Sequence, residues 1–558
     1  MSPTIAASRS TVSRVWRDLL LLTLVIGGLF GFMLGSRALG TPDEARYSEI
    51  PREMVVTHNY VTPRLNGVKY FEKPAFFYWL QSAAIKMFGL GEWSLRFWTA
   101  LFALAGGISV YLAGNYLFNA RTGLISAVIL ATSLLYYGMS RVVTLDMTLS
   151  VLMSGSLFAF LAATHLTPGR NRRLLFWLFY VLAALATLTK GLIGIVVPGL
   201  IIGSWIALTN QWRLLKEIYL PSGLTLLLLI AVPWHVLVIK ANPEFFHFYF
   251  IHEHFERFLT KVHQRYQPPW FFIPIVLLGL FPWTVFLFQA IKFNLPHLRK
   301  LHEQQDALFL LLWVGLIFVF FSVSDSKLIP YILPIFPPLA LLLGRYLSAR
   351  WEQGTRGLTA SYWGLLATSL IFAIAFVAIG YYRPSPNPAQ LRVHMAALAI
   401  ILVLGAMSAL WLNWRRNPRA AFVSLMVSTM LFLMSLNASL PLLDTRSVKD
   451  LALALKPQLK TRDDVVTYET YYQDLPFYLQ RRVTIADWKG ELEFGTTVED
   501  DRAWMIDKDT FWRRWQSPAT IYMMTSRKTY EQLRNTGKPD LHLIAENAEN
   551  VVLRNKSD

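Results

Sequence analysis

Long apolar runs separated by charged residues fill the first 440 positions of the chain. A helix that crosses a bilayer needs about 20 mostly apolar residues, and about thirteen runs reach or approach that length. The pattern therefore predicts a polytopic α-helical membrane protein with about 13 transmembrane helices. The runs lie near residues 18–39, 95–118, 123–139, 147–165, 174–189, 191–209, 218–239, 269–290, 307–323, 329–345, 360–380, 393–413 and 420–440.

The first run could also be a cleaved signal peptide, but no small-residue cleavage site follows it. Basic residues gather in alternate connections. Eighteen Lys and Arg lie in the short segments on the N-terminal side and five in the short loops on the other side. Because short cytoplasmic loops carry the excess of positive charge, we expect a cytoplasmic N-terminus. Two long outer loops, 40–94 and 240–268, carry further basic residues, which long segments can do without changing the topology.

The apolar runs stop after about residue 441. Acidic and basic residues are nearly balanced from there on, and stretches with β character, such as 464–468 and 519–524, precede an amphipathic segment at 525–533. Strands followed by helices predict a small α/β layer domain. We therefore expect a transmembrane domain over residues 1–440 and a soluble α/β domain over residues 441–558, which an odd number of spans places outside.

The composition supports this division. Hydrophobic residues make up 54% of the 558 positions and charged residues only 16%, against about 25% charged in soluble domains. The formal net charge is +18, but the basic residues are interleaved with apolar spans, so we expect anionic lipid rather than nucleic acid as the partner. The chain has no cysteine, which excludes thiol nucleophiles and Cys-ligated metal centres.

Ionisable residues stand where the outer loops meet the predicted spans. Asp43 and Glu44 follow Pro42 at the end of the first run, where they could cap a short surface helix or act as an acid, a base or a metal ligand. Other candidates could anchor the chain in the headgroup layer or grip a lipid phosphate. They are Arg46, Glu72, Lys73, Asp146, Lys190, Arg257, Lys327 and Tyr331.

All these candidates lie at one face of the membrane. A transporter or channel would place ionisable groups near mid-span, so the pattern favours chemistry at the interface over transport. His252 and His254, flanked by glutamates, could bind a divalent ion, although solvated loop histidines would explain the same pattern.

The motifs resemble those of the polyprenyl-phosphate-dependent GT-C glycosyltransferases. Within that superfamily the chain looks like the bacterial 4-amino-4-deoxy-L-arabinose lipid A transferases, relatives of the protein O-mannosyltransferases. The resemblance rests on Asp43-Glu44 with Arg46 and Tyr47, Tyr-x-x-Lys-Pro-x-x-x-Tyr-Trp at 70–79, Ser-Arg-x-x-x-x-Asp at 140–146, Thr-Lys-Gly at 189–191 and Lys-Leu-x-x-Tyr at 327–331.

The resemblance implies an enzyme of the bacterial inner membrane with a periplasmic C-terminal domain. It would transfer aminoarabinose from undecaprenyl phosphate to the phosphates of lipid A or lipopolysaccharide, giving resistance to polymyxin and other cationic peptides. We expect a monomer among membrane lipids. Two alternatives stay open: an enzyme like the protein O-mannosyltransferases that uses a polyprenyl-phosphate sugar, and a lipid flippase or transporter.

Under this interpretation we expect Asp43, Glu44, Arg46 and Asp146 to form the catalytic group. Positive charge stabilises the phosphate that leaves in the transition state, so the donor-phosphate candidates are Lys73, Arg257, Tyr331, Lys190 and Lys327. A phosphate acceptor is largely ionised near neutral pH and needs no strong base. Asp43 would therefore position the acceptor or the sugar amine, or hold a metal, rather than act as a base. No cofactor is certain; zinc or magnesium could be held by Glu72 with His252 or His254.

Overall fold

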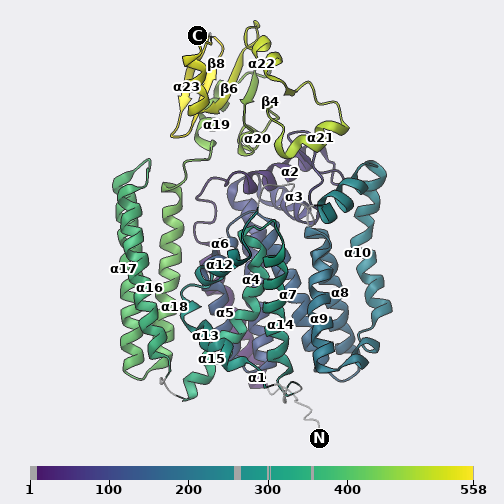
Figure 1. Ribbon diagram of the computed structural model, residues 1–558, viewed down its shortest axis with the longest axis vertical. Coiled ribbons are helices and arrows are strands. Elements are labelled where there is room, and N and C mark those ends of the chain that lie inside the picture. The colour runs from purple at the N-terminus through teal and green to yellow at the C-terminus, as the bar shows by residue number, and fades with distance from the viewer. Residues whose placement is uncertain are drawn as a thin grey trace.

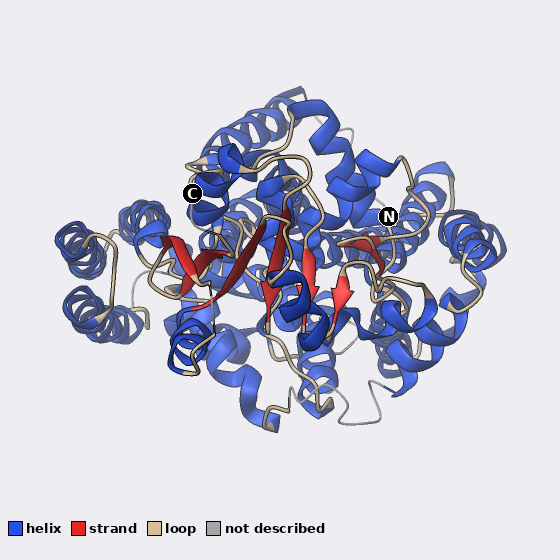
Figure 2. Ribbon diagram, turned by 90° about the horizontal axis from the view of Figure 1, so that it is seen from above, coloured by secondary structure: helices blue, strands red, loops and turns tan. Residues whose placement is uncertain are grey.

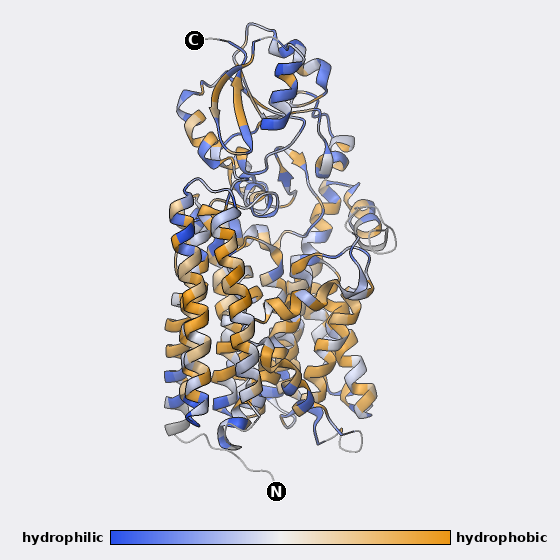
Figure 3. Cartoon of the chain, turned by 60° about the vertical axis from the view of Figure 1, so that its left-hand side comes forward, coloured by the Kyte–Doolittle hydropathy of each residue, from blue (hydrophilic) through white to orange (hydrophobic). Residues whose placement is uncertain are grey.

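A computed structural model of the chain describes residues 9–256, 266–297, 301, 303–353, 357–538 and 540–556. Helices form a large bundle, and a smaller mixed α/β domain covers one end of it (Figure 1). Hydrophobic residues concentrate on the bundle, whereas the domain is mixed (Figure 3). The predicted fold class, a polytopic helical membrane protein with a C-terminal α/β domain, is confirmed.

Nine helices among the described residues are long and apolar enough to cross a membrane. A tenth span results if the two halves of a segment that bends by 105° are counted together. The nine are α4 (Glu92–Leu117), α7 (Leu145–Thr164), α8 (Arg170–Lys190), α10 (Leu220–Ala241), α14 (Gln305–Val323), η6 (Ile329–Ile335) with α15 (Phe336–Gln353), α16 (Thr359–Tyr382), α17 (Pro388–Trp414) and α18 (Pro418–Ser439) with η7 (Leu440–Leu442). The bent segment contains η3 (Pro269–Phe271), α12 (Phe272–Gly279), η4 (Trp283–Phe286) and α13 (Leu287–Asn294).

The other three predicted runs are also helical, but they differ from the full spans that the sequence predicted. The first forms α1 (Arg9–Gly31), which ends before residue 39. The run 123–139 divides at Ser133, whose extended backbone separates α5 (Ala120–Thr132) from α6 (Leu134–Met139). The helix α9 (Ile193–Thr209) has 17 residues, about 26 Å at 1.5 Å per residue, which is short of a hydrocarbon core of about 30 Å. By length and composition, nine or ten segments of the described chain thus qualify as full spans, fewer than the thirteen predicted.

The C-terminal domain is built on a six-stranded sheet with the order β5-β4-β3-β6-β8-β7. Neighbours from β5 to β6 run parallel, and β8 runs antiparallel to β6 and β7. Figure 2 shows these strands crossing above the bundle. The elements are α19 (Lys449–Leu455), η8 (Lys456–Gln458), β3 (Asp464–Tyr468), α20 (Asp474–Leu479), β4 (Thr484–Ala486), η9 (Gly490–Leu492), α21 (Glu493–Val498), β5 (Met505–Ile506), α22 (Lys508–Trp515), β6 (Ile521–Ser526), α23 (Arg527–Asn535), β7 (His542–Glu546) and β8 (Asn550–Arg554).

The outer loop 40–94 is folded between the bundle and this domain. It contains α2 (Asp43–Thr57), a hairpin of β1 (Arg64–Leu65) and β2 (Val68–Lys69), and α3 (Phe76–Phe88). One hydrophobic core joins the loop to the domain, with Ile50, Leu65 and Tyr78 on one side and Leu475 and Val483 on the other. The loop and the C-terminal domain therefore share a core.

The inner face of α2 also buries charge. Arg52 donates to both oxygens of Glu49 at 2.7 and 2.5 Å, and the backbone N–H of Gly67 donates to the carboxylate of Glu53 at 3.0 and 3.2 Å. Burial, with a further contribution from the neighbouring Glu49 carboxylate, raises the pKa of Glu53 to about 8. Glu53 is therefore largely protonated below that pH.

A carboxyl whose pKa is raised by folding makes the folded state lose stability as the pH rises from about 5 to 8. Replacing Glu53 with Gln keeps an acceptor for Gly67 and removes the titration. We predict that between pH 5.5 and 8 the apparent melting temperature of the wild type falls by roughly 3 °C or more beyond that of Glu53→Gln. The exposed Glu531→Gln serves as the control, and equal falls in Glu53→Gln and the wild type would contradict the prediction.

Candidate active site

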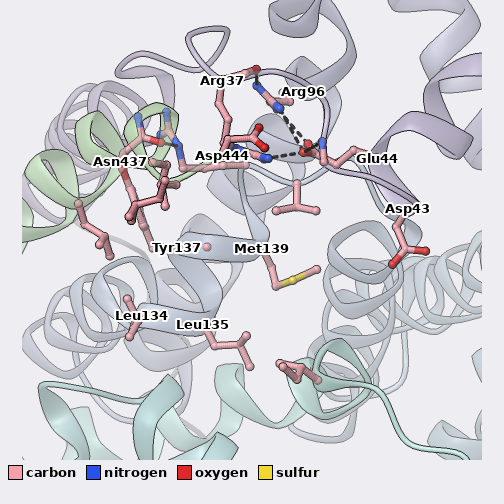
Figure 4. A pocket seen from close by; sticks show the side chains of 18 of the residues that line it. Arg37, Asp43, Glu44, Arg96, Leu134, Leu135, Tyr137, Met139, Asn437 and Asp444 are labelled. Carbon is pink, nitrogen blue, oxygen red and sulfur yellow. Dashed lines mark hydrogen bonds and ion pairs between the residues drawn. The ribbon is translucent and has the colours of Figure 1, made fainter. Parts of the chain in front are cut away.

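Glu44, at the start of α2, is buried in a network of donors. Arg96 of α4 donates to both carboxylate oxygens at 3.0 and 3.1 Å, and Arg37 lies 2.5 Å from one of them (Figure 4). The backbone N–H groups of Gly40 and Val143 donate as well, at 2.8 and 3.1 Å. Burial raises the pKa of Glu44, but the two guanidiniums outweigh it and hold the pKa below its usual value. The geometry therefore indicates an anchoring role for Glu44, and its predicted catalytic role stays a prediction.

Arg96 completes this anchor, although the sequence analysis did not single it out as a functional residue. It is 1% exposed, and it also donates to the carbonyl oxygens of Leu34, Arg37 and Ala38 at 2.7 to 3.1 Å. One side chain thus fixes the segment after α1, the start of α2 and α4 relative to one another. An arginine inside an apolar run was the available signal, since buried charge is kept only where it is paired.

Asp43, next to Glu44 in the chain, is in contrast half-exposed, with 55% of its side chain accessible. It lies apart from the Glu44 network in Figure 4 and lines a cavity of about 720 Å³. Its carboxylate is 3.6 Å from the Nη1 atom of Arg46. Asp43 therefore borders both this cavity and the surroundings of Arg46.

Arg46 is buried at the centre of an acidic cluster. Its Nη2 atom lies 2.5 Å from the Oε2 atom of Glu491, which comes from the C-terminal domain, and its Nη1 atom donates to the hydroxyl of Tyr70 at 3.3 Å. Burial raises the pKa of Glu491, Arg46 opposes this, and Glu72 and Asp43 raise it further. Three carboxylates thus surround one guanidinium, an arrangement that suits an added cation such as an amine. Glu491 was missed because nothing in its local sequence links it to α2.

A second cluster combines three predicted residues. The ammonium of Lys190, at the end of α8, contacts the carboxylate of Asp146 in the first turn of α7, and it lies 4.4 Å from the ring centre of Tyr331. Lys327 lies elsewhere: it donates to the carbonyl oxygen of Gln267 at 2.7 Å, and burial lowers its pKa. The structure therefore brings together Asp146, Lys190 and Tyr331 but not Lys327.

The remaining predicted residues are only partly described. Lys73 donates to the carbonyl oxygen of Glu72 at 2.7 Å, and His252 stacks on Phe248 with ring centres 5.2 Å apart. Arg257 and the side chain of His254 lie outside the described residues. Within the part of the chain that is described, no group of three or more His, Asp or Glu side chains could hold a metal ion. The metal site thus stays a prediction.

The cavity beside Asp43 is apolar along its walls and cationic at one end. Leu135, Ile275 and Leu436 are among its walls. At its charged end stands Arg141, whose hydrogen bonds within the described residues go to neutral oxygens, including those of Asn437 at 2.9 Å and Phe30 at 2.9 Å. Arg37 and Arg96 share the carboxylate of Glu44 there, and Asp444 also lines the cavity, so that its four arginines, Arg446 included, outnumber its three carboxylates by one. The cavity can therefore take a ligand with an anionic head and apolar chains.

Two family models match parts of the chain. Residues 72–236 match that of dolichyl-phosphate-mannose-protein mannosyltransferase, and residues 451–555 that of the aminoarabinose transferase C-terminal domain. The undecaprenyl phosphate-alpha-4-amino-4-deoxy-L-arabinose arabinosyl transferase of Pectobacterium carotovorum is 28% identical over 527 residues, covering 92% of this chain and 93% of that protein. A transferase with the same description from Proteus mirabilis is 34% identical over 56% of each chain.

Solved structures extend the likeness. The crystal structure of ArnT from Cupriavidus metallidurans bound to undecaprenyl phosphate has a TM-score of 0.85 and 29% identity, and the match covers 99% of each chain. The archaeal oligosaccharyltransferase AglB from Archaeoglobus fulgidus has a TM-score of 0.51 at 12% identity, over 94% of this chain and 70% of that one, and shares the fold alone.

The anchor at Glu44 gives a direct prediction. Removing one partner of a buried ion pair costs roughly 3–5 kcal/mol because the other charge stays buried. We expect Arg96→Ala to lower the apparent melting temperature by on the order of 10 °C, and Glu44→Gln by a similar amount. The exposed Arg419→Ala controls for loss of a positive charge, and an Arg96→Ala protein as stable as this control would contradict the anchoring role.

Proposed function

We propose that the chain is a member of the aminoarabinose transferase family of GT-C glycosyltransferases and that it transfers 4-amino-4-deoxy-L-arabinose from undecaprenyl phosphate to a phosphate of lipid A. The reaction takes place at the periplasmic face of the bacterial inner membrane, with the N-terminus in the cytoplasm. The added amine lowers the negative charge of lipid A and so weakens the binding of cationic peptides such as polymyxin.

One observation carries the proposal: Asp43 borders two environments of opposite charge. On one side is the apolar cavity with its arginine end, which fits an acceptor that has acyl chains and a phosphate. On the other side is the acidic cluster of Glu72 and Glu491 around Arg46, which fits an amino sugar. An enzyme that joins an amino sugar to a lipid phosphate needs these two surfaces to meet at the reacting atoms.

The donor's phosphate is assigned to the cationic side chains at the membrane face. Lys73 follows Glu72 directly, and Lys190 is held by Asp146 against the ring of Tyr331. Asp146 thus acts by orienting Lys190 rather than by touching the sugar. Positioned cations are well suited to this reaction because the leaving phosphate gains charge in the transition state.

The proposed displacement needs no strong base. An ionised oxygen of the acceptor phosphate attacks the anomeric carbon, the bond from this carbon to the donor phosphate oxygen breaks, and undecaprenyl phosphate leaves with the electron pair. Because the acceptor oxygen carries no proton near neutral pH, Asp43 orients the acceptor or the amine instead of accepting a proton.

A second candidate function is favoured by one observation, the match of residues 72–236 to the protein mannosyltransferase family. That reaction uses a serine or threonine hydroxyl, which would require Asp43 to act as a general base. A flippase would move the lipid without cleaving it.

The test combines purified protein in lipid vesicles with undecaprenyl-phosphate aminoarabinose and lipid A, followed by mass spectrometry of the lipids. We predict that lipid A gains the mass of one aminoarabinose residue and that Asp43→Asn slows the transfer by roughly 100-fold, because correct placement of the reactants is lost. The exposed Asp450→Asn is the matched control. Unchanged lipid A with the wild type would contradict the proposed function. A modified Ser/Thr peptide or lipid movement without cleavage would support one of the alternatives.

A further inference from the structure

Residues 494–499, which comprise α21 from its second residue onward and Glu499 and which we name the clasp, form one of the parts of the C-terminal domain that lie against the outer loop 40–94. Figure 1 shows α21 at the lower edge of the domain, directly above α2. The clasp contains none of the side chains assigned above to the donor, the sugar or the acceptor. Its contacts nevertheless reach both long outer loops, 40–94 and 240–268, which carry the donor-phosphate candidates Lys73 and Arg257.

Gly495 shows how closely the clasp approaches the hairpin. A Cβ atom at this position would lie 2.3 Å from the Cγ1 atom of Val68 and 2.4 Å from the carbonyl oxygen of Lys69. Real Cβ atoms do not come this close, and the backbone oxygen cannot move aside as a flexible side chain can. The helix α21 therefore packs directly on the backbone of β2. The contact is made at Lys69, which lies four residues before Lys73.

Glu499 bridges the two strands of the hairpin next to the second outer loop. Its carboxylate accepts hydrogen bonds from both Nη atoms of Arg64 at 2.6 and 2.8 Å, and the Nζ atom of Lys69 is 3.3 Å away. Lys69 also donates to Glu244 at 2.6 Å. Glu244 lies just after α10, at the start of the loop 240–268. Glu499 thus bridges the two strands, and Lys69, which it contacts, links the hairpin to the beginning of that loop.

Phe494 makes the same connection through aromatic rings. It stacks on Phe248, with ring centres 3.8 Å apart and planes 20° from parallel, and its ring centre is 6.2 Å from that of Phe71. Phe248 belongs to η2 (His247–Glu256), the π-helix that opens the second loop, and Phe71 directly precedes Glu72 and Lys73. Phe494 therefore contacts both segments at once.

Local structure alone would not hold these segments. A hairpin with two residues in each strand is marginal in water, and π-helical turns are rare without tertiary support. The same domain also holds the hairpin tip: Asn66 exchanges hydrogen bonds of 2.9 Å with the backbone of Val483 in both directions, and the indole of Trp504 donates to the Asn66 carbonyl at 3.0 Å.

We propose that the clasp is a positioning element for the lipid-linked sugar, which sets the placement of the Glu72–Lys73 segment relative to the start of the loop 240–268. The C-terminal domain thereby takes part in binding the donor without contacting the reacting atoms. This inference rests on the proposed function, and it assigns Phe494 and Glu499 as positioning residues that act through Phe248, Phe71 and Lys69.

The test measures transfer rates with the donor and the acceptor varied separately, for Phe494→Ala and Glu499→Gln. We expect the KM for the donor to rise roughly tenfold in Phe494→Ala, while the KM for the acceptor stays within about twofold of the wild type. Phe494→Tyr keeps the stacked ring and should restore the donor KM. Glu493→Ala, an exposed change on the same helix, is the matched control and should leave both constants unchanged.

A loss of folded protein would lower kcat and leave both KM values as they are, so a uniform fall in kcat for both clasp variants would overturn the proposal. So would a donor KM in Phe494→Ala and Glu499→Gln equal to that of Glu493→Ala. The affinity for undecaprenyl phosphate alone, measured without sugar transfer, provides an independent readout and should weaken with the donor KM. A wild type that binds undecaprenyl phosphate but transfers no aminoarabinose contradicts the proposed function, and the binding measurement still decides on the clasp.

Discussion

The buried ion pair between Glu44 and Arg96 is the contact on which the geometry of the site depends. Two charged groups at the edge of an apolar bundle are tolerated only because each satisfies the other and the backbone groups around them. In doing so they fix the segment after α1, the start of α2 and α4 as one unit. Asp43 and Arg46, on either side of Glu44 in the chain, take their places from this unit.

The second constraint is that the outer loop 40–94 has too little structure to stand alone. Its helices and hairpin bury their apolar faces against the C-terminal domain, and Glu491 of that domain contacts Arg46 of the loop. The bundle and the domain therefore build the site together. The bundle supplies the cavity with its arginine end, and the domain completes the acidic cluster and holds the loops that carry Lys73 and Phe248.

The sequence predicted what depends on local pattern. Apolar runs of bilayer length become helices because buried backbone groups must pair within the segment, and the α/β character of the C-terminal domain follows from strands that alternate with helices. The prediction of a single span over 123–139 was wrong because one extended residue, Ser133, divides the helix there. Motifs at the ends of apolar runs also pointed to Asp43, Arg46 and the Asp146–Lys190–Tyr331 group, whose roles in catalysis and binding stay predictions.

What the sequence could not give depends on partners distant in the chain. Nothing near Glu44 in the sequence reveals that Arg96 and Arg37 surround it. Glu491, Phe494 and the other contacts of the C-terminal domain were missed for the same reason: their partners lie hundreds of positions earlier in the chain.

In the proposed reaction an amino sugar and a lipid phosphate meet at Asp43. The most direct measurement is the phosphorus-31 NMR spectrum of lipid A recovered after incubation with the protein and undecaprenyl-phosphate aminoarabinose. We predict that the signal of a phosphate monoester is replaced by that of a phosphodiester that bears the sugar. Monoester signals that stay unchanged, with the sugar absent or attached through a hydroxyl group, would contradict it.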